Sequence, residues 1–307
     1  ENLRGQALAL RAYYYLMLVN LYGQPYNADG VDLNTSLGVP LVLTSGVTDS
    51  YLERNTLKEV YEQIEDDLLL SLPLLEVYGT ENDVYRVTDC FAHAVLARMY
   101  LYQEKWEKVI EHADYVLAKK SLLMKLTNMM TVLWGSVTLD YSKNVYDVNS
   151  VENIWSYSSE KEYSGLLPAI GVKYPAAYRA SDDLYKMYEY DATNVDNFGD
   201  LRVKCFYKQV MIAGDLYNPV HRPYYGTKGN MTLSWNTTKG IRVAELYLSK
   251  AEAIIRLVLE GKREANDLKI VIDALNYLRE SRYDTRNVPY EPKEDFESTD
   301  ALLTFCL

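Results

Sequence analysis

Apolar side chains recur at steps of three and four residues along the N-terminal part of the chain, a spacing that predicts amphipathic helices. A first helix is predicted to bury the face formed by Leu3, Ala7, Leu10, Tyr14, Met17, Leu18 and Leu21. A second is predicted to bury Leu57, Val60, Tyr61, Ile64, Leu68 and Leu72. It begins at a capping box, in which the Thr56 hydroxyl and the Glu59 carboxylate each satisfy a free helix N–H, and Pro73 is expected to end it.

Residues 91–117 and 241–280 each carry the pattern of two helices joined by a tight turn. Residues 103–105 form the predicted turn of the first hairpin, and Gly261 gives the second its helix end and turn. The offsets of small and aromatic residues in both hairpins resemble those of tetratricopeptide (TPR) units. Since TPR pairs bury their faces against neighbouring pairs, we expect one stack that is discontinuous in sequence; two small helical domains are the alternative.

The segment between the hairpins, residues 120–240, is rich in turn signals and has no long helical pattern. Runs at 153–157 and 203–207 are predicted to be brief strands, and Ser181 is the predicted cap of a short helix. The segment holds three of the four Trp and many of the Tyr, of which Trp155 is expected in the core. Because loops on a rigid scaffold commonly carry binding residues, we expect the ligand surface here.

These patterns predict a mostly α fold, in which discontinuous TPR-like helical hairpins form a scaffold and an irregular loop-rich region carries short strands. The expected organisation is a helical scaffold at 1–119 with the hairpin 91–117, an aromatic-rich ligand-facing region at 120–240, a hairpin at 241–283 that completes the scaffold, and a linker with the start of a truncated helix at 284–307. Ser298 is the predicted cap of that helix, and both ends of the chain are expected to be cropped.

Charge excludes two classes of partner. The 307 residues include 32 Lys+Arg against 43 Asp+Glu, which gives a net charge of −11. Nucleic-acid binding is not expected, because no basic surplus exists to displace counterions from phosphates. A polybasic membrane-surface helix is disfavoured for the same reason.

Cysteine and histidine usage predicts neither a disulfide framework nor a metal or cofactor site. The three cysteines, Cys90, Cys205 and Cys306, are expected to be buried thiols. No CxxC pair occurs and the three histidines are scattered, so a zinc or haem site is not expected. Whether Asp196, Asn197 and Asp200 hold calcium stays open, since such clusters are usually turns.

Tyrosine is the one unusual count, with 29 Tyr against 5 Phe and 4 Trp. A tyrosine offers a flat apolar face and a hydroxyl, which suits polar ligands such as sugars. The alternative for each single residue is a ring that packs between helices while its hydroxyl reaches water.

Several strings, in order along the chain, resemble the SusD/RagB family of outer-membrane lipoproteins of Bacteroidetes. They are QALALRAYYY at 6–15 with LYG at 21–23, GVPLV at 38–42, RNT to DDL at 54–68, AVLARMYLY at 94–102, RVAELYL with AEA at 242–253 and NYLRESR at 276–282. The family's lipidated N-terminal Cys, part of its N-terminal region and its C-terminal segment have no counterpart in this sequence.

The resemblance implies a cell-surface nutrient-binding protein, held in the outer membrane by lipid on an N-terminal Cys absent from this chain. It implies capture of oligosaccharides and their delivery to a SusC-like TonB-dependent transporter, which would be the protein partner. The same role for peptides, as in RagB-like relatives, and a TPR protein-interaction scaffold without a small ligand remain alternatives. No cofactor is implied.

Aromatic residues in predicted loops are the candidate ligand-binding residues, because a flat ring can stack on a sugar face. They are Tyr163, Tyr178, Tyr224, Tyr225 and Trp235. The alternative for each is a ring tucked back into the core, and Trp106 in the first hairpin is expected there. Arg11 and Arg242 are expected to pair with carboxylates, with Glu245 and Glu252 as candidate partners.

Catalysis is not expected. With 43 acids, adjacent pairs such as Asp66 and Asp67 occur by chance, and neighbours on a helix point in different directions. A glycosidase instead needs two carboxylates facing each other across a cleft. The sequence has no GxSxG elbow, P-loop, HExxH or dinucleotide fingerprint.

Overall fold

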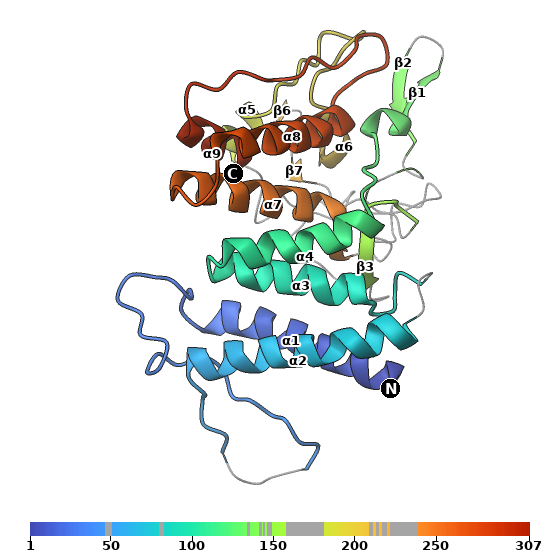
Figure 1. Ribbon diagram of the computed structural model, residues 1–307. Helices are drawn as coiled ribbons and strands as arrows, with labels where there is room; N and C mark the ends of the chain where they lie inside the picture. Colours follow the sequence, from blue (N-terminus) through green and yellow to red (C-terminus); the bar gives the residue numbers. More distant parts are fainter. Residues whose placement is uncertain are drawn as a thin grey trace. The chain divides into compact units, whose positions relative to one another are not determined.

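The computed structural model describes residues 1–46, 51–79, 83–133, 136–140, 143, 145, 149–157, 181–208, 211–212, 215–216, 220–221 and 239–307. Helices dominate these residues, and the sheets among them are two-stranded (Figure 1). The chain divides into two compact units. Unit 1 contains residues 1–121, 245–271 and 297–307, and unit 2 contains residues 122–244 and 272–296.

Unit 1 is a stack of helices. In chain order they are α1 (Asn2–Tyr22), α2 (Leu57–Tyr78), α3 (Asp89–Tyr102), α4 (Trp106–Lys119), nearly all of α7 (Val243–Leu259), the short 3-10 helix Ala265–Asp267 and α9 (Thr299–Cys306). Each of the first four packs on its neighbour in sequence, as Figure 1 shows. The mostly α class with TPR-like hairpins is therefore confirmed.

The stack in unit 1 is discontinuous in sequence, because α7 contacts α3 and α4. Arg98 of α3 forms a two-pronged ion pair with Glu245 of α7, with N···O distances of 2.5 and 2.6 Å. At the start of α4, the Trp106 indole N–H donates to the carboxylate of Glu260, which directly follows α7, at 2.9 Å. Two-pronged Arg–carboxylate pairs fix orientation as well as distance, so these contacts set the register of α7 against the hairpin.

Capping and turn residues behave as the sequence predicts. The capping box is present, with the Glu59 N–H donating to Thr56 at 3.3 Å and the Thr56 N–H donating to Glu59 at 2.9 Å. Ser298 accepts from the Ala301 N–H at 3.1 Å and caps α9. In the turn after α3, Glu104 adopts φ +56°. The cores of both units contain the expected tryptophans, Trp106 and Trp155, and the three cysteines are buried.

The predicted buried face of α1 is wrong. Leu3 and Leu21 are 77% and 71% exposed, and Tyr14, Met17 and Leu18 are also exposed. The buried face is made of Gly5, Ala9, Ala12, Tyr13, Tyr15, Leu16 and Val19. A Cβ on Gly5 would lie 3.0 Å from the Leu74 Cβ of α2, so the two backbones approach closely. Gly5, Ala9 and Ala12 lie on this face and leave room for close packing, so this face is buried although it also carries large side chains.

Two further helix predictions need correction. Pro73 does not end α2, which continues to Tyr78, because Pro73 lies on the exposed side while Leu75 beyond it is buried. The partner of Arg11 is Asp67 of α2, with both N···O distances 2.6 Å, whereas Glu245 pairs with Arg98. The candidate Glu252 pairs with Arg256 one turn along α7.

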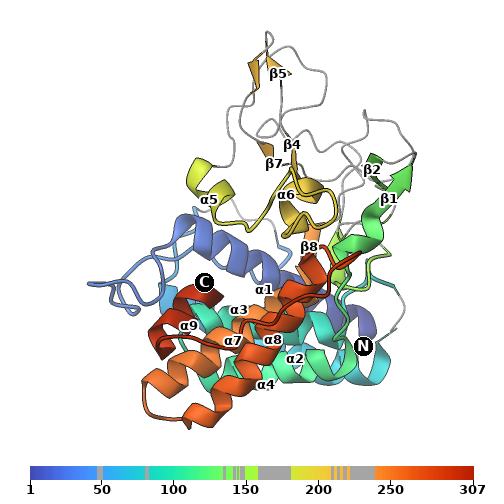
Figure 2. The ribbon, with the colours of Figure 1, turned by 90° about the horizontal axis from the view of Figure 1, so that it is seen from above.

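Unit 2 contains short strands, short helices and most of α8. Its elements are the 3-10 helix Leu126–Met129, β1 (Met130–Leu133), β2 (Ser136–Leu139), β3 (Asn153–Tyr157), α5 (Asp182–Lys186), α6 (Leu201–Phe206), β4 (Tyr207–Lys208), β5 (Met211–Ile212), β6 (Asp215–Leu216), β7 (Val220–His221), β8 (Lys239–Arg242) and α8 (Leu268–Arg282). The antiparallel pairs are β1–β2, β3–β8, β4–β7 and β5–β6. Figure 2 shows α6 beside β4 and β7.

The predicted strand at 203–207 is mostly a helix. Residues Leu201–Phe206 form α6, because the Asp200 carboxylate accepts the Arg202 N–H at 3.0 Å and so caps a helix start. The strand predicted at 153–157 is confirmed as β3, and it pairs with β8, where Ile241 had been assigned to a helix. The Ser181 cap is also confirmed, since its hydroxyl accepts the Leu184 N–H at 3.1 Å.

No helix among the described residues is long and apolar enough to cross a membrane.

A buried histidine pair in unit 1 makes its stability sensitive to acid. His93 of α3 and His112 of α4 are buried, and their Nδ1 atoms lie 2.8 Å apart, so one must donate and the other accept. Burial, reinforced by repulsion from His112, lowers the pKa of His93 from 6.5 to about 4, and burial lowers the pKa of His112 too. The charge of Asp89 raises the pKa of His93, against the net shift, and the charge of Lys119 lowers it further. The Glu76 carboxylate lies 3.8 Å from the His93 Nε2.

We therefore expect the free energy of unfolding to fall by about 2 kcal/mol between pH 7 and pH 5. Both imidazoles are kept neutral in the folded chain, whereas in the unfolded chain they take up protons below pH 6.5. The stabilisation is thus complete above that pH and is lost as the pH falls towards 4. Urea unfolding at the two pH values measures the effect. The difference in the free energy of unfolding between the two pH values should be smaller in His93→Gln. An equal difference in this variant would contradict the role of the histidine pair.

Candidate functional site

The aromatic residues singled out from the sequence lie outside the described part of the chain. They are Tyr163, Tyr178, Tyr224, Tyr225 and Trp235. Their role as ligand residues therefore stays a prediction, and the candidate site below consists of other residues.

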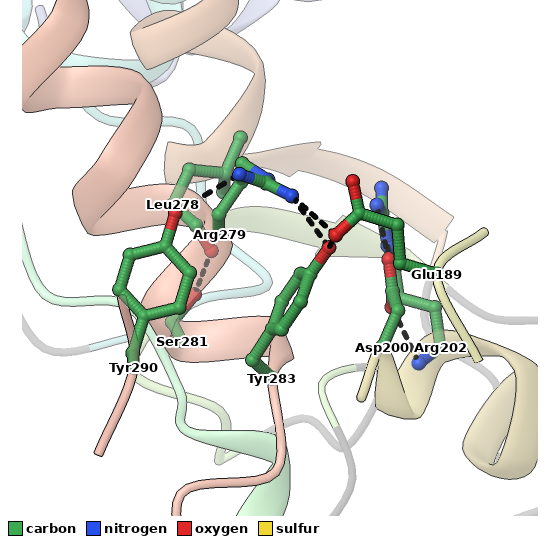
Figure 3. A network of polar contacts seen from close by, with 8 residues as sticks. All are labelled: Glu189, Asp200, Arg202, Leu278, Arg279, Ser281, Tyr283 and Tyr290. Carbon is green, nitrogen blue, oxygen red and sulfur yellow. Dashed lines mark hydrogen bonds and ion pairs between the residues drawn. The ribbon is translucent and has the colours of Figure 1, made fainter. Parts of the chain in front are cut away.

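A hollow of about 550 Å³ opens in unit 2 beside the C-terminal end of α8. Two segments far apart in sequence line it: residues 189–199, and the end of α8 with the loop that follows it. The lining residues are Glu189, Asn197, Gly199, Arg279, Tyr283, Asp284, Val288, Pro289, Tyr290, Glu291, Pro292 and Lys293. Figure 3 shows the polar network at its wall.

Arg279 is the centre of this network. Its Nη2 donates to the Tyr283 hydroxyl at 2.6 Å and to a Glu189 carboxylate oxygen at 2.9 Å. Its Nη1 donates to the Tyr290 hydroxyl at 3.2 Å (Figure 3). Tyr283 directly follows the last residue of α8, and its N–H donates to the Arg279 carbonyl at 3.0 Å, so this turn brings the two side chains together. A single guanidinium therefore orients both tyrosines and the carboxylate.

The Tyr283 hydroxyl links Arg279 to Glu189, because it accepts one hydrogen bond and donates another. Its hydroxyl accepts from Arg279 and donates to Glu189 at 2.6 Å. Burial, together with the hydrogen bond to Glu189, raises the pKa of Tyr283 well above its ordinary value of 10. The phenol therefore stays protonated and remains a donor at any physiological pH.

Asn276 of α8 holds the loop that carries Tyr290. Its side-chain oxygen accepts from the Tyr290 hydroxyl at 2.7 Å and from the Lys293 N–H at 2.9 Å. Its side-chain nitrogen donates to the Lys293 carbonyl at 3.0 Å. Three hydrogen bonds of the half-buried Asn276 amide fix the loop against the helix. The Tyr290 ring therefore has a defined position although it lies outside any helix or strand.

The opposite wall is tied down by Asp284. This buried carboxylate accepts the Phe198 N–H at 3.0 Å and pairs with Arg286 at 2.7 Å, and the Asp284 N–H donates to the Gly199 carbonyl at 2.8 Å. These contacts lower the pKa of Asp284, against the effect of its burial. The segment around Gly199 is thereby fixed to the end of α8.

One carboxylate of the Asp196–Asp200 cluster, for which the sequence leaves calcium binding open, is paired with an arginine. Asp200 is buried and forms a two-pronged pair with Arg202, the shorter N···O distance being 2.6 Å. Within the described ranges, no group of three or more His, Cys, Asp or Glu is placed to hold a metal ion. The arrangement therefore supports a turn held by an ion pair.

The chemistry of the hollow suits a neutral, hydroxyl-rich ligand. The half-buried rings of Tyr283 and Tyr290 lie 5.4 Å apart at 68° and present an apolar corner. The Glu189 side chain is 65% exposed and accepts from Tyr283 and Arg279 through one oxygen, Oε2. Both charge signs occur on the wall, so the site favours no strongly charged ligand.

Gly199 lies where no side chain fits. Its φ is +71°, and an added Cβ would lie 2.1 Å from the Glu189 carbonyl oxygen. We expect Gly199→Ala to cost about 1–3 kcal/mol of unfolding free energy and to displace Glu189. Denaturant unfolding measures the cost. The matched control is Gly30→Ala, which has φ +78° but open space around the new Cβ. An equal loss of unfolding free energy in Gly199→Ala and Gly30→Ala would contradict the steric contact between a Cβ at position 199 and the Glu189 carbonyl.

Sequence reasoning missed Glu189, Arg279, Tyr283 and Tyr290 as site residues. Arg279 and Asn276 lie in a string that carried the family resemblance, but they were treated as part of a helix end. The usable signal was the Arg279–Tyr283 spacing of four, followed by a loop in which Tyr290 lies between Pro289 and Pro292.

Comparison with known proteins places the fold. Residues 1–101 match a SusD-like family model described as "Starch-binding associating with outer membrane". No curated protein matches the sequence.

Several solved structures share the fold across nearly the whole chain. A SusD-like carbohydrate binding protein from Bacteroides vulgatus is 21% identical with a TM-score of 0.70, covering 99% of this chain and 58% of its own. A SusD superfamily protein from Bacteroides thetaiotaomicron is 22% identical with a TM-score of 0.66, covering 98% and 62%. A SusD-like protein from Bacteroides fragilis is 17% identical with a TM-score of 0.67, covering 98% and 64%. The chain thus spans less than two thirds of the length of these relatives.

Proposed function

We propose that this chain, which is SusD-like in its fold and over residues 1–101 in its sequence, is a binding protein that captures a carbohydrate and leaves it chemically unchanged. The observation that carries the proposal is the hollow in unit 2, where one guanidinium orients two tyrosines and an exposed carboxylate.

Carbohydrate recognition follows from what these groups offer. A pyranose ring has an apolar face of C–H groups and a rim of hydroxyls, each of which can donate and accept. The Tyr290 and Tyr283 rings supply apolar contact, while the Glu189 carboxylate and the Lys293 side chain at the wall supply polar contact to the rim. The network is hydrogen-bonded before the ligand arrives, so little ordering is lost on binding.

The wider role is capture at the cell surface. We place the protein at the outer membrane, lipid-anchored through an N-terminal Cys absent from this chain, where it would deliver an oligosaccharide to a SusC-like TonB-dependent transporter. The match of residues 1–101 to a family described as associating with the outer membrane supports this placement. The SusD-like fold of solved carbohydrate-binding relatives supports the ligand class.

An array of glycans and peptides, probed with the intact chain, tests the ligand class. We expect retention by one or more neutral oligosaccharides and slower migration in gels that contain soluble starch or another matching polysaccharide. Retention by peptides alone would contradict the carbohydrate proposal and favour the RagB-like alternative. Retention by neither would leave the TPR scaffold as the better description, and would overturn the proposal.

Absence of turnover is part of the same proposal. The array ligand, incubated with the purified chain, should be recovered with unchanged chain length by mass spectrometry. Cleavage that persists after further purification would contradict a purely binding role.

A further inference from the structure

A second hollow lies in unit 1, at the end of the stack where four segments meet. These are the C-terminal end of α1, the loop that follows it, the start of α2 and the turn between α3 and α4. It consists of two neighbouring hollows, its two lobes, of about 430 and 360 Å³, which share Tyr26 and Tyr61 in their linings. All of these residues belong to unit 1 and none to the hollow in unit 2.

The shared wall is a fixed pair of aromatic rings. Tyr61 is 3% exposed, and its hydroxyl donates to the Asn20 side chain at 3.0 Å. The half-buried Tyr26 ring lies edge-on to it, with centroids 4.7 Å apart at 73°. Burial raises the pKa of both phenols, so both hydroxyls stay protonated. The first lobe adds the exposed ring of Tyr102.

Polar groups without a complete set of partners line the same space. Gln103 is 7% exposed and lines the second lobe, and its Oε1 accepts no hydrogen bond within the part of the chain that the structure describes. This oxygen is itself buried, so a ligand donor reaches it once the Gln103 amide turns towards the lobe, and the contact would satisfy an acceptor that is otherwise costly to bury. Asn27 lines the first lobe and donates to the Tyr102 carbonyl at 3.3 Å.

The charged residues of the second lobe largely balance one another. Lys58 lies 3.9 Å from Glu62, and Lys105 lies 3.6 Å from Glu65. Because both cations have a carboxylate beside them, the lobe has no cationic centre for an anion. A neutral molecule with hydroxyl donors and an apolar face matches the two rings and the free amide oxygen better than an ion does.

We propose that this hollow is a second binding site, for a single neutral sugar ring, separate from the site in unit 2. The ligand class rests on the proposed function, but the location does not.

Saturation-transfer NMR with free monosaccharides tests the site. The probes are D-glucose, D-galactose, D-mannose and D-xylose, each measured with the native chain and with Arg279→Ala, which removes the centre of the network in unit 2. We expect transfer to at least one sugar in both proteins, and a reduction of about tenfold in the affinity that remains in Arg279→Ala when Tyr26→Ala is added.

Matched variants separate ring contact from folding. Tyr26→Phe keeps the ring and should keep the affinity within about twofold, because only the hydroxyl is lost. Tyr22→Ala removes an exposed tyrosine on α1 outside the hollow and should have no effect. Unchanged transfer after Tyr26→Ala in the Arg279→Ala background, where the unit 2 site is removed, overturns the second site. If the array still retains glycans, the proposed function survives that result; an array without glycan retention removes the proposed function instead.

Discussion

Glu152→Ala is expected to lower the free energy of unfolding by about 3–5 kcal/mol. Glu152 is wholly buried in unit 2, and its Oε2 accepts from the Arg282 Nη2 at 2.8 Å, while its Oε1 accepts from the Met124 N–H at 2.9 Å and forms an ion pair with the Arg282 Nη1 at 2.7 Å. Arg282 also donates to the Met124 carbonyl at 2.8 Å. Removing the carboxylate leaves a buried guanidinium with one carbonyl partner, and that uncompensated charge sets the cost.

Urea unfolding of matched variants distinguishes this mechanism from general damage. Lys125→Ala removes the exposed pair between Lys125 and Glu280 and should cost no more than about 1 kcal/mol. The double variant Glu152→Leu with Arg282→Met removes both charges and should recover much of the loss, because apolar pairs of similar volume replace buried ion pairs well. A Glu152→Ala cost below about 1 kcal/mol would contradict the account.

Arg279→Ala is expected to weaken carbohydrate binding at the unit 2 hollow by at least about tenfold. The guanidinium contacts Glu189, Tyr283 and Tyr290 at once, so its removal takes one hydrogen-bond partner from each of three ligand-facing groups. Isothermal titration with the oligosaccharide selected by the array measures the change. A binding group that is no longer held in position lowers the affinity for the ligand even when the chain still folds.

If Arg279→Ala does not fold, more conservative variants test the same role of the unit 2 hollow in carbohydrate binding. Tyr283→Phe and Tyr290→Phe retain the packing and lose one hydroxyl each, and each should weaken binding by several-fold. Glu280→Ala, the adjacent residue on α8 with a surface partner in Lys125, should bind as the native chain does. Native affinity in Arg279→Ala and in both tyrosine variants would remove the hollow from the binding site.

Helix positions could be predicted from the sequence because they depend on local signals. The capping box at Thr56 and the cap at Ser298 are visible in a few residues, and the structure contains both. The buried face of α1 could not be predicted in the same way, because apolar residues occur on both of its faces. Which face is buried depends on how closely α2 approaches, and Gly5 decides that approach.

The site was harder to predict than the fold, because its residues meet only after folding. Glu189 and Arg279 are far apart in sequence, and a turn around Gly199 and a loop held by Asn276 bring their surroundings together. A single sequence offers no signal for such a pairing. The helix at 201–206 shows the same limit on a smaller scale, since the Asp200 cap outweighs the strand-forming residues that follow it.

The central claim is that a rigid, non-reactive hollow at the end of α8 holds a neutral carbohydrate. A crystal structure of the chain with the oligosaccharide selected by the array tests it most directly. We expect an intact sugar ring against Tyr290 and Tyr283, with a hydroxyl on the Glu189 carboxylate. A ligand bound with the unit 2 hollow empty, or a cleaved ligand within it, would contradict the account.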